Sequence, residues 1–358
     1  MATIPVVCDP TLAAIDAAIV ESQDAMPRHY LGMSSIGHPC ERKLWFDFRW
    51  SATRSFDTKT IKRFEDGHRG EDIQAARLRM VKGINLQTHD ARTGKQFGFE
   101  ACGGHVKGHM DGAIVGLLQA PKTWHVWEHK QVNEAKFKKL IKLKEKLGEK
   151  NALKEWDAIY HGQALLYMRC SGMERHYLTC STPGGRDTVS VRTDADKAEA
   201  DRLFAKAQRI VDAAEPPPGI SERPDWYECK LCDYHDLCHS SDVPLPTCRS
   251  CAHVTPITDG QWHCTRNNKL LDVPAQKAAC QSHRFIPALL VRFAAVVDAD
   301  TEANWIKYQH RVTCNEFING LPPEGYESVE IYSLEDKKAL GDASVQAFRT
   351  ELGAKIAA

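Results

Sequence analysis

Residues 108–130 read GHMDGAIVGLLQAPKTWHVWEHK. A strand is predicted at residues 113–118 and a second strand at residues 124–131. Residues 119–123 form the predicted turn between them. Because residues i and i+2 of a strand lie on one face of a sheet, Glu128 and Lys130 are expected to point the same way. If the strands pair, Asp111 lies at the end of the first strand, where it meets both side chains. The segment therefore predicts two carboxylates beside one ammonium group.

Two carboxylates at such positions suit a hard divalent cation. Mg²⁺ and Mn²⁺ prefer oxygen ligands and take few of them from the protein, leaving the rest to water and phosphate. A metal ion held in this way activates water and stabilises the charge of a phosphodiester under attack. A plainer interpretation stays open, because Asp-Gly is ordinary turn chemistry and Glu-x-Lys occurs on many solvent-exposed strands.

The three charged residues resemble the PD-(D/E)xK nuclease signature. Asp111 stands as the first acid and Glu128-His129-Lys130 as the (D/E)xK, with Met110 in place of the usual proline. The resemblance implies an α/β, restriction-endonuclease-like core with a mixed central sheet flanked by helices. It also implies that Asp111, Glu128 and the backbone carbonyl of His129 hold Mg²⁺ or Mn²⁺. Lys130 would then position the attacking water or offset charge on the phosphate.

Residues 58–81 predict a long amphipathic helix. Its expected core contacts are Ile61, Phe64, Ile73, Ala76 and Met80. The helix contains Gly67-x-x-x-Glu71, which resembles the first motif of RecB-type nucleases and makes Glu71 a further metal ligand, with His68 as the alternative. A helical glycine costs roughly 1 kcal/mol relative to alanine, so Gly67 and Gly70 indicate close packing or close approach of a ligand. Glu71 as a merely solvated helical residue is the other interpretation.

Residues 156–169 predict a second helix that bears on the site. Gln163 and Tyr167 are four positions apart and therefore share one face of it. They resemble the Gln-x-x-x-Tyr motif of RecB-type nucleases, in which the glutamine orients the site and the tyrosine contacts DNA. Tyr167 as an ordinary core residue is the alternative.

A lysine-rich segment, residues 133–154, lies between these motifs. Such helices are usually solvated faces, but this one directly follows the predicted catalytic strand, where it can track phosphates. The candidate DNA-binding residues are Lys136, Lys138, Lys139 and Lys142.

The first cysteine set has the spacing Cys-x2-Cys-x5-Cys and needs a fourth ligand. With an early cysteine in the context Gly-His-Pro-Cys-Glu-Arg, it resembles the iron–sulfur nucleases of the AddB-type and CRISPR-associated adaptation groups. The resemblance implies a 4Fe–4S cluster that fastens the late segment to the early one, and Zn²⁺ is the alternative. The implied ligands are Cys40, Cys229, Cys232 and Cys238.

A second cysteine set follows Pro244 and Pro246 and predicts a small structural zinc module. Its four candidate ligands are Cys248, Cys251, Cys264 and Cys280, with His253, His263 and His283 as possible replacements for one of them. Nearby aromatic and basic residues offer contacts to DNA or a partner, at Trp262, Arg266, Lys269 and Arg284.

Composition limits the class of protein. The chain has 358 residues, 42% hydrophobic and 26% charged, with a net charge of zero, which is typical of a soluble globular protein of about two domains. No signal peptide and no membrane span are predicted, so we expect a cytoplasmic location, in the bacterial host cytosol if the chain is phage-encoded. In that reducing compartment, 13 cysteines favour metal binding over disulfides. The sequence contains no Gly-x-x-x-x-Gly-Lys-Ser/Thr loop, the phosphate-binding motif of many helicases. This argues against a built-in helicase.

Four segments are expected along the chain. They are an N-terminal arm (1–30), the nuclease core closed by its cluster (31–240), the zinc module (244–287) and a mixed C-terminal region (288–358). Further strands are predicted at 96–101, 105–108, 176–180 and 188–192. Further helices are predicted at 12–23, 40–50, 194–213, 302–317 and 344–354.

The combined motifs predict a metal-dependent DNA exonuclease acting on single strands or duplex ends. Their linear order is that of iron–sulfur RecB-type nucleases, and the resemblance covers residues 30–240. It implies a stand-alone enzyme from a phage or mobile-element recombination system, with a recombination or single-strand-annealing protein as a candidate partner. A catalytically inactive nucleic-acid-binding scaffold is one alternative, and an interaction protein with coincidental acidic motifs is another.

Overall fold

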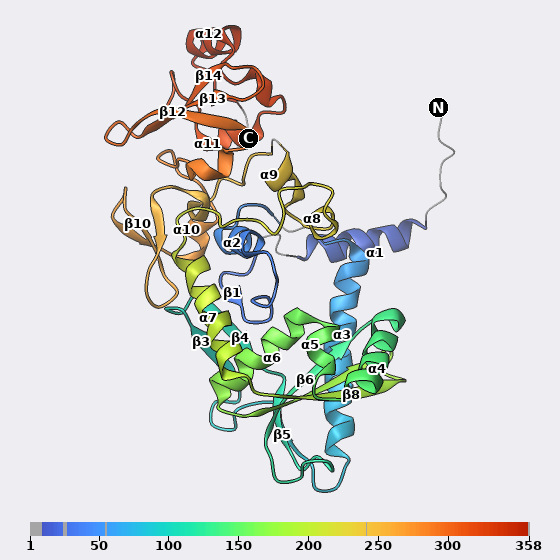
Figure 1. Cartoon of the computed structure of the whole chain (residues 1–358). Coiled ribbons are helices and arrows are strands. Elements are labelled where there is room, and N and C mark those ends of the chain that lie inside the picture. Colours follow the sequence, from blue (N-terminus) through green and yellow to red (C-terminus); the bar gives the residue numbers. More distant parts are fainter. Residues whose placement is uncertain (1–8, 24–26, 54–55, 241, 357–358) are drawn as a thin grey trace. The chain divides into compact units, whose positions relative to one another are not determined.

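The computed structural model describes residues 9–23, 27–53, 56–240 and 242–356 (Figure 1). The chain forms two compact units, each built from separate stretches of sequence. Unit 1 comprises residues 1–25, 54–99 and 108–203, and unit 2 comprises residues 26–53, 100–107 and 204–358. The four segments expected from the sequence are continuous, in contrast, and they stay a prediction.

Unit 1 contains a mixed five-stranded sheet in the order β2-β5-β6-β7-β8. Its strands are β2 (Asn85–Gln87), β5 (Gly112–Val115), β6 (His125–Gln131), β7 (Arg175–Ser181) and β8 (Thr188–Asp194). The predicted pairing is confirmed, since β5 and β6 are antiparallel with Gly112 opposite Trp127. β7 runs parallel to β6 and antiparallel to β8. β6 is therefore the central strand, and its first five residues are buried.

β5 is shorter than predicted because Gly116 has a φ of 90°, a left-handed conformation that ends an extended strand. The lysine-rich segment is likewise divided. α4 stops at Leu147, before Gly148 with a φ of 77°, and α5 starts at Ala152.

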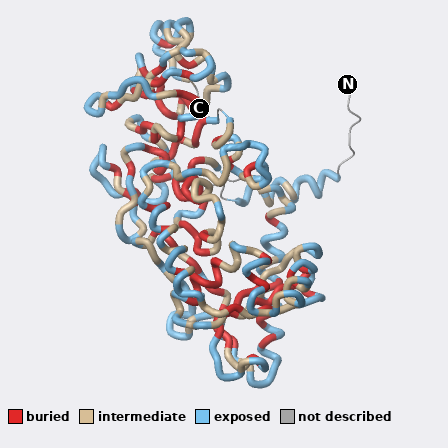
Figure 2. The backbone as a smooth tube through the Cα atoms, viewed as in Figure 1, coloured by how far each residue is buried: buried red, intermediate tan, exposed pale blue. Residues whose placement is uncertain are grey.

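Helices surround this sheet, and both α3 and α6 contact β6. The helices of unit 1 are α1 (Pro10–Glu21), α3 (Thr58–Arg79), α4 (Glu134–Leu147), α5 (Ala152–Trp156) and α6 (Ala158–Ser171). α7 (Lys197–Asp212) begins in unit 1 and ends in unit 2. α6 is buried over the seven residues from Gly162 to Met168, and Figure 2 shows such buried positions gathered around the sheet. The helix predictions for these segments are confirmed to within a few residues.

The buried face of α3 differs from the expected one. Ile61 is buried as predicted, but Phe64, Ile73 and Met80 are 44–83% exposed, and Ala76 is exposed as well. The remaining buried positions are Gly70, Gln74, Ala75 and Leu78. Ala75 and Leu78 pack into one cluster with Leu86, Ile114, Leu117 and Trp127. The prediction failed because it selected the most apolar residues, whereas the sheet packs against a face that carries small and polar residues.

The N-terminal part of unit 2 contains α2 (Glu41–Arg49), whose buried side chains include Leu44 and Trp45. A three-stranded sheet has the order β1-β4-β3, and its strands β3 and β4 each cross from one unit to the other in the sequence. Its strands are β1 (Leu31–Gly32), β3 (Gly98–Ala101) and β4 (Val106–His109). Two short helices, α8 (Tyr227–Lys230) and α9 (His235–His239), carry Cys229 and Cys238, and Cys232 lies between them.

Two further antiparallel sheets belong to unit 2. The first consists of β9 (Val254–Pro256), β10 (Trp262–Cys264) and β11 (Lys269–Leu271), and the second of β12 (Ala294–Asp300), β13 (Trp305–His310) and β14 (Glu316–Asn319). The short helices around them are η1 (Cys248–Ser250), α10 (Val273–Gln276), η2 (Pro287–Leu290), α11 (Ser328–Ser333), η3 (Lys337–Ala339) and α12 (Ala343–Leu352).

The helix predicted at 302–317 is wrong, because this segment forms most of β13 and β14. Tyr308 and Phe317 face each other across the two strands and are 0% and 3% exposed, so a two-residue period governs their burial. The helix predicted at 344–354 is confirmed as α12.

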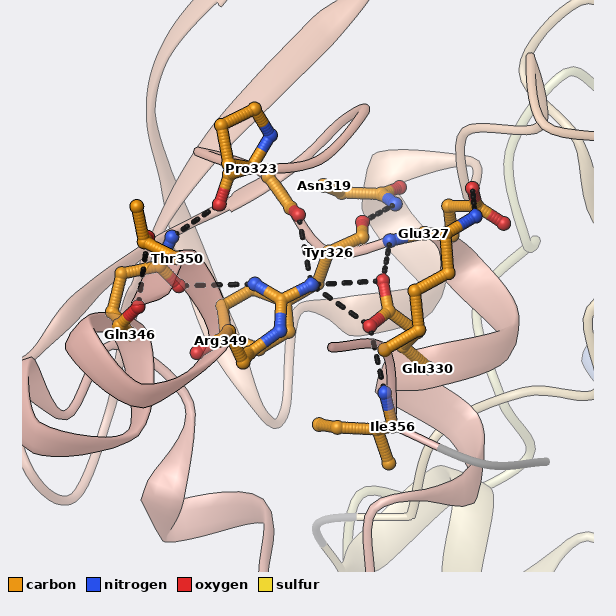
Figure 3. Close-up of polar contacts among 11 residues, drawn as sticks. Asn319, Pro323, Tyr326, Glu327, Glu330, Gln346, Arg349, Thr350 and Ile356 are labelled. Carbon is orange, nitrogen blue, oxygen red and sulfur yellow. Dashed lines mark hydrogen bonds and ion pairs between the residues drawn. The ribbon is translucent and has the colours of Figure 1, made fainter. Parts of the chain in front are cut away.

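A buried ion pair joins α11 and α12. Arg349 Nη2 lies 2.8 Å from Oε1 and 3.0 Å from Oε2 of Glu330 (Figure 3). The Arg349 guanidinium also stacks on the Tyr326 ring at 3.9 Å. These contacts fasten the last helix to α11 and to Tyr326. No described helix of the chain is both long and apolar enough to cross a membrane.

Candidate active site

Asp111 and β6 are joined by a hydrogen bond at the end of the β5–β6 pair. The backbone N–H of His129 donates to Asp111 Oδ2 at 2.8 Å. Asp111 directly precedes β5, and Gly112 pairs with Trp127, so the register brings the first acid beside Glu128 and Lys130. The structure thus joins the three residues of the predicted signature.

Glu128 accepts two hydrogen bonds on one of its carboxylate oxygens. Lys130 Nζ lies 2.5 Å from Oε1, and Gln163 Nε2 on α6 donates to the same atom at 2.7 Å. Glu128 is 3% exposed, and its other oxygen, Oε2, is buried without a hydrogen-bond partner among the described residues. A buried anionic oxygen left in this state is costly, which makes it a natural position for a cation.

Glu71 on α3 is the third carboxylate of the group and is partly buried. Burial and the nearby Asp111 carboxylate raise the pKa of Glu71 to about 7. Burial and, next, Asp111 raise the pKa of Glu128 to about 8, and burial also raises the pKa of Asp111. Three carboxylates therefore compete for the single ammonium group of Lys130. Burial lowers the pKa of Lys130, but Glu128 and Asp111 outweigh this effect and raise it, so Lys130 stays charged.

The side chain of His129 points away from this group. Its ring bonds to Thr179 Oγ1 at 3.0 Å and Ser181 Oγ at 3.1 Å on β7. Burial and the Lys130 charge lower the pKa of His129 to about 4, so the ring is neutral at physiological pH. Only the backbone of His129 remains available to a metal at the carboxylates. His68, the alternative ligand, is exposed.

Tyr167 lies one helical turn beyond Gln163, with 3.4 Å between its hydroxyl and Gln163 Nε2. It is 2% exposed and packs at a tilt against Phe99. This burial favours support of Gln163 and the core over contact with DNA.

Tyr160 is a neighbour of the site that the sequence reasoning missed. Lys130 Nζ lies 5.2 Å from the centroid of its ring, a cation–π distance. Tyr160 precedes Gln163 by three residues and Tyr167 by seven, so the spacing on one helical face was the signal that could have revealed it.

Some of the lysines predicted to bind DNA make contacts within unit 1. Lys136 Nζ pairs with Asp157 at 2.6 Å, and Lys139 Nζ donates to the Trp156 carbonyl at 3.2 Å. Lys138 pairs at 3.3 Å with Glu134 one turn away, and Lys142 is exposed. Their contact with DNA stays a prediction.

The first cysteine set lies within unit 2. Cys40 precedes α2, and its thiol acts electrostatically on each of the three late cysteines. Burial first, and Cys40 in addition, raise the pKa of Cys238 to about 11. The structure thus associates the early cysteine with the late ones, and the metal-binding role that the resemblance implies for them stays a prediction.

The four cysteines of the second set line one cavity of unit 2. No group of three or more His, Cys, Asp or Glu side chains, within the part of the chain that the structure describes, is placed so that it could hold a metal ion as it stands. Metal binding at the carboxylates or at either cysteine set therefore requires side chains to turn toward a common point.

No family model and no curated protein matches the chain. Among solved structures, it is similar to the crystal structure of SSO0001, with 14% identity and a TM-score of 0.38 over 64% of this chain and 96% of that chain. It is also similar to LHK-Exo, an alkaline exonuclease from Laribacter hongkongensis, with 14% identity and a TM-score of 0.33 over 55% of this chain and 90% of that one. The complex of LHK-Exo with dAMP matches at 15% identity and the same TM-score. Likenesses this weak assign neither fold nor activity, so a function has to come from the side chains described above.

Proposed function

We propose that this chain is a metal-dependent DNA exonuclease with a PD-(D/E)xK-type, restriction-endonuclease-like core. One observation carries the proposal: Asp111, Glu128, Lys130 and Gln163 come from separate segments and are linked by hydrogen bonds at one point of the central strand. The chemistry of this set matches the PD-(D/E)xK signature and the Gln-x-x-x-Tyr motif that the sequence resembles. Single-stranded DNA or duplex ends are the proposed substrate.

The residues fit a hard divalent cation. Glu128 Oε2 is buried without a partner among the described residues, and the raised pKa values of Glu71, Asp111 and Glu128 indicate excess negative charge. Glu71, Asp111, Glu128 and the His129 carbonyl would hold Mg²⁺ or Mn²⁺, oxygen donors that both ions accept. When bound, such an ion activates water and offsets negative charge on a phosphodiester.

Lys130 would act as a fixed positive charge. Since Glu128 and Asp111 keep its pKa raised, it cannot serve as a proton acceptor at neutral pH. Its ammonium would instead donate hydrogen bonds to the attacking water or to a phosphate oxygen. Gln163 holds Glu128 in one orientation, and the ring of Tyr160 covers the Lys130 ammonium from the side of α6.

An iron–sulfur cluster at Cys40, Cys229, Cys232 and Cys238 is the second part of the proposal. The electrostatic influence of Cys40 on the other three thiols supports it, and four thiolates are the usual ligands of a 4Fe–4S cluster. Anaerobic purification should give a broad visible absorption band that Cys232→Ser removes. A colourless wild-type protein that contains zinc at this set would replace the cluster with Zn²⁺.

The nuclease is tested with end-labelled single-stranded and duplex DNA in Mn²⁺, Mg²⁺ or EDTA. Wild-type protein should degrade DNA only with a metal, and Lys130→Met should not. Lys197→Met is the matched control, since Lys197 is an exposed lysine of the same unit that pairs with Glu174. Covalently closed circles should resist an exonuclease, and the product ladder gives its polarity.

DNA binding without degradation by metal-supplied wild-type protein would instead favour the catalytically inactive scaffold. A recombination or single-strand-annealing partner, a phage or mobile-element origin and a cytoplasmic location remain predictions from the sequence.

A further inference from the structure

Four cysteines of unit 2 line one cavity of about 120 Å³. Two of them, Cys251 and Cys264, are only 4% and 5% exposed, and the other two lie nearer the surface. The four are Cys248, Cys251, Cys264 and Cys280. Sulfur donors around a small cavity are the environment that Zn²⁺ accepts and that Mg²⁺ or Ca²⁺ avoids.

Backbone hydrogen bonds hold these cysteines in place. The N–H of Cys251 donates to the Cys248 carbonyl at 3.2 Å, and the N–H of Cys248 donates to the Ala278 carbonyl at 3.1 Å. Cys264 ends β10, where it pairs with Val254 on β9. The carbonyl of Cys280 accepts from the N–H of His283 at 2.9 Å. Turns and a sheet therefore hold the backbone at all four positions, and only the side chains have to turn.

The Cys251 thiol also accepts hydrogen bonds from backbone N–H groups of His253 and Arg284. Such donors stabilise a thiolate more than a thiol, because they are directed at developing negative charge. Metal sites commonly contain this second layer of donors around their ligands. Burial has the larger effect and raises the pKa of the Cys251 thiol to about 11, so the placement of the four sulfurs, and not their ionisation, supports the site.

Two guanidinium groups are buried in the same unit without an acid. Arg49 and Arg249 are 3% and 1% exposed, and neither forms an ion pair with a described residue. Arg249 donates to the carbonyls of Phe48 at 3.0 Å and His29 at 2.8 Å. Arg49 donates to the carbonyl of Val254 at 2.9 Å. Val254 follows Cys251 by three residues.

Neutral carbonyls accept hydrogen bonds from both arginines but leave their charge uncompensated, and Arg49 Nε is buried without a hydrogen-bond partner among the described residues. Both guanidiniums lie over the Trp262 ring, at 5.1 Å and 4.5 Å, and Trp262 is on the strand that ends at Cys264. A buried charge without a counter-charge costs several kcal/mol. Arg49 and Arg249 therefore indicate negative charge in the cysteine module.

We propose that Cys248, Cys251, Cys264 and Cys280 bind one Zn²⁺ through four thiolates, and that Arg49 and Arg249 balance the charge of this centre. Four thiolates around one Zn²⁺ carry a net charge of minus two, which two guanidiniums neutralise. On binding, the four thiols release their protons to solvent. A site with four protein ligands has no open position, so it is structural. This proposal concerns unit 2 and is independent of the nuclease.

His283 is the competing ligand. Its Nε2 donates to the Thr247 carbonyl at 2.9 Å, and its Nδ1 has no partner among the described residues. His253 also lines the cavity, but its Nε2 bonds to Asn304 at 2.6 Å. A site of three thiolates and one imidazole would carry a single negative charge and leave one guanidinium uncompensated.

The first test uses wild-type protein, so no variant has to fold. X-ray absorption at the zinc edge should show four sulfur neighbours at about 2.3 Å. Titration with a mercurial reagent should release this zinc as Cys248, Cys251, Cys264 and Cys280 react. A shell of three sulfurs and one nitrogen, or protein that lacks zinc after expression in zinc-supplied medium, would overturn the proposal.

Variants locate the site. Cys264→Ser should lose one equivalent of zinc relative to wild type. Cys314→Ser should retain it, because Cys314 is an exposed cysteine outside both sets. Arg249→Gln should lower zinc affinity about 10–100-fold in competition with a chelator, and Arg249→Lys should restore a large part of it. Equal affinity in wild-type and Arg249→Gln proteins would refute the charge balance.

Discussion

Gln163 on α6 donates a hydrogen bond of 2.7 Å to Oε1 of Glu128 on β6. Lys130 occupies the same oxygen, so Gln163 and Lys130 together leave Oε2 as the free side of the carboxylate. We predict that Gln163→Met frees this carboxylate to rotate and lowers the rate of DNA hydrolysis about 10–100-fold. Tyr167→Phe removes only a hydroxyl that lies 3.4 Å from Gln163 Nε2, so it should lower the rate of DNA hydrolysis much less. Single-turnover rates with Mn²⁺ measure both, and an unchanged rate for Gln163→Met would contradict this role.

Glu71 should destabilise the metal-free protein as the pH rises. Its folded-state pKa is raised from 4.5 to about 7, so the folded state favours the protonated form and loses stability as the pH increases from about 4.5 through 7. Glu71→Gln, which is always neutral, should be more stable than wild type at pH 8 by about 1–2 kcal/mol and similar to it at pH 4.5.

Urea unfolding in EDTA at the two pH values measures this difference. Glu134→Gln is the control, because Glu134 is exposed on α4 and pairs with Lys138 one turn away. If Glu71→Gln raises the free energy of unfolding by the same amount at both pH values, the ionisation of Glu71 is not the cause.

Metal binding should release protons and strengthen with pH. Glu71 and Glu128, with pKa values of about 7 and about 8, must ionise to become ligands. Between pH 6 and 8, the Mn²⁺ affinity should rise by up to about tenfold per pH unit for each proton released. Calorimetry in buffers of different ionisation enthalpy counts these protons. Binding that is independent of pH and of buffer would mean that the cation occupies another site.

Two glycines should respond to alanine in opposite directions. A Cβ at Gly67 in α3 would meet nothing within 4 Å, so Gly67→Ala should stabilise the helix by about 1 kcal/mol. A Cβ at Gly112 would lie 2.7 Å from the Gln87 carbonyl on the paired strand, so Gly112→Ala should lower the melting temperature. Thermal unfolding of both variants checks this, and destabilisation by Gly67→Ala would reveal a contact that the structure lacks.

The paired strands that bring Asp111, Glu128 and Lys130 together could be predicted from the sequence, because strand periodicity and turn composition are local properties. Strand alternation put Glu128 and Lys130 on one face, and the short turn allowed the two strands to pair, as they do in the structure. Helical spacing in the same way aligned Gln163 with Tyr167. Gly70 also behaved as expected, since a Cβ there would come 2.4 Å from Gln131 Oε1, whereas Gly67 has open space.

Features that depend on distant partners could not be predicted. The buried face of α3 is decided by the sheet against which it packs, and apolarity alone selected Phe64 and Ile73, which are exposed. The segment 302–317 has a mixed pattern, and pairing between β13 and β14 decides that it is extended. Burial of Arg49 and Arg249 was equally invisible, because charged residues are ordinarily expected at the surface.

The most direct test of the account is a double-mutant cycle on single-turnover hydrolysis of end-labelled single-stranded DNA with Mn²⁺. Asp111→Asn and Glu128→Gln should each lower the wild-type rate by at least about a hundredfold, and the double variant should be scarcely slower than either single one, because residues that act as a unit are not additive. Independent, additive effects would contradict a shared metal site. A folded, metal-supplied wild-type protein that hydrolyses no DNA would contradict the nuclease itself.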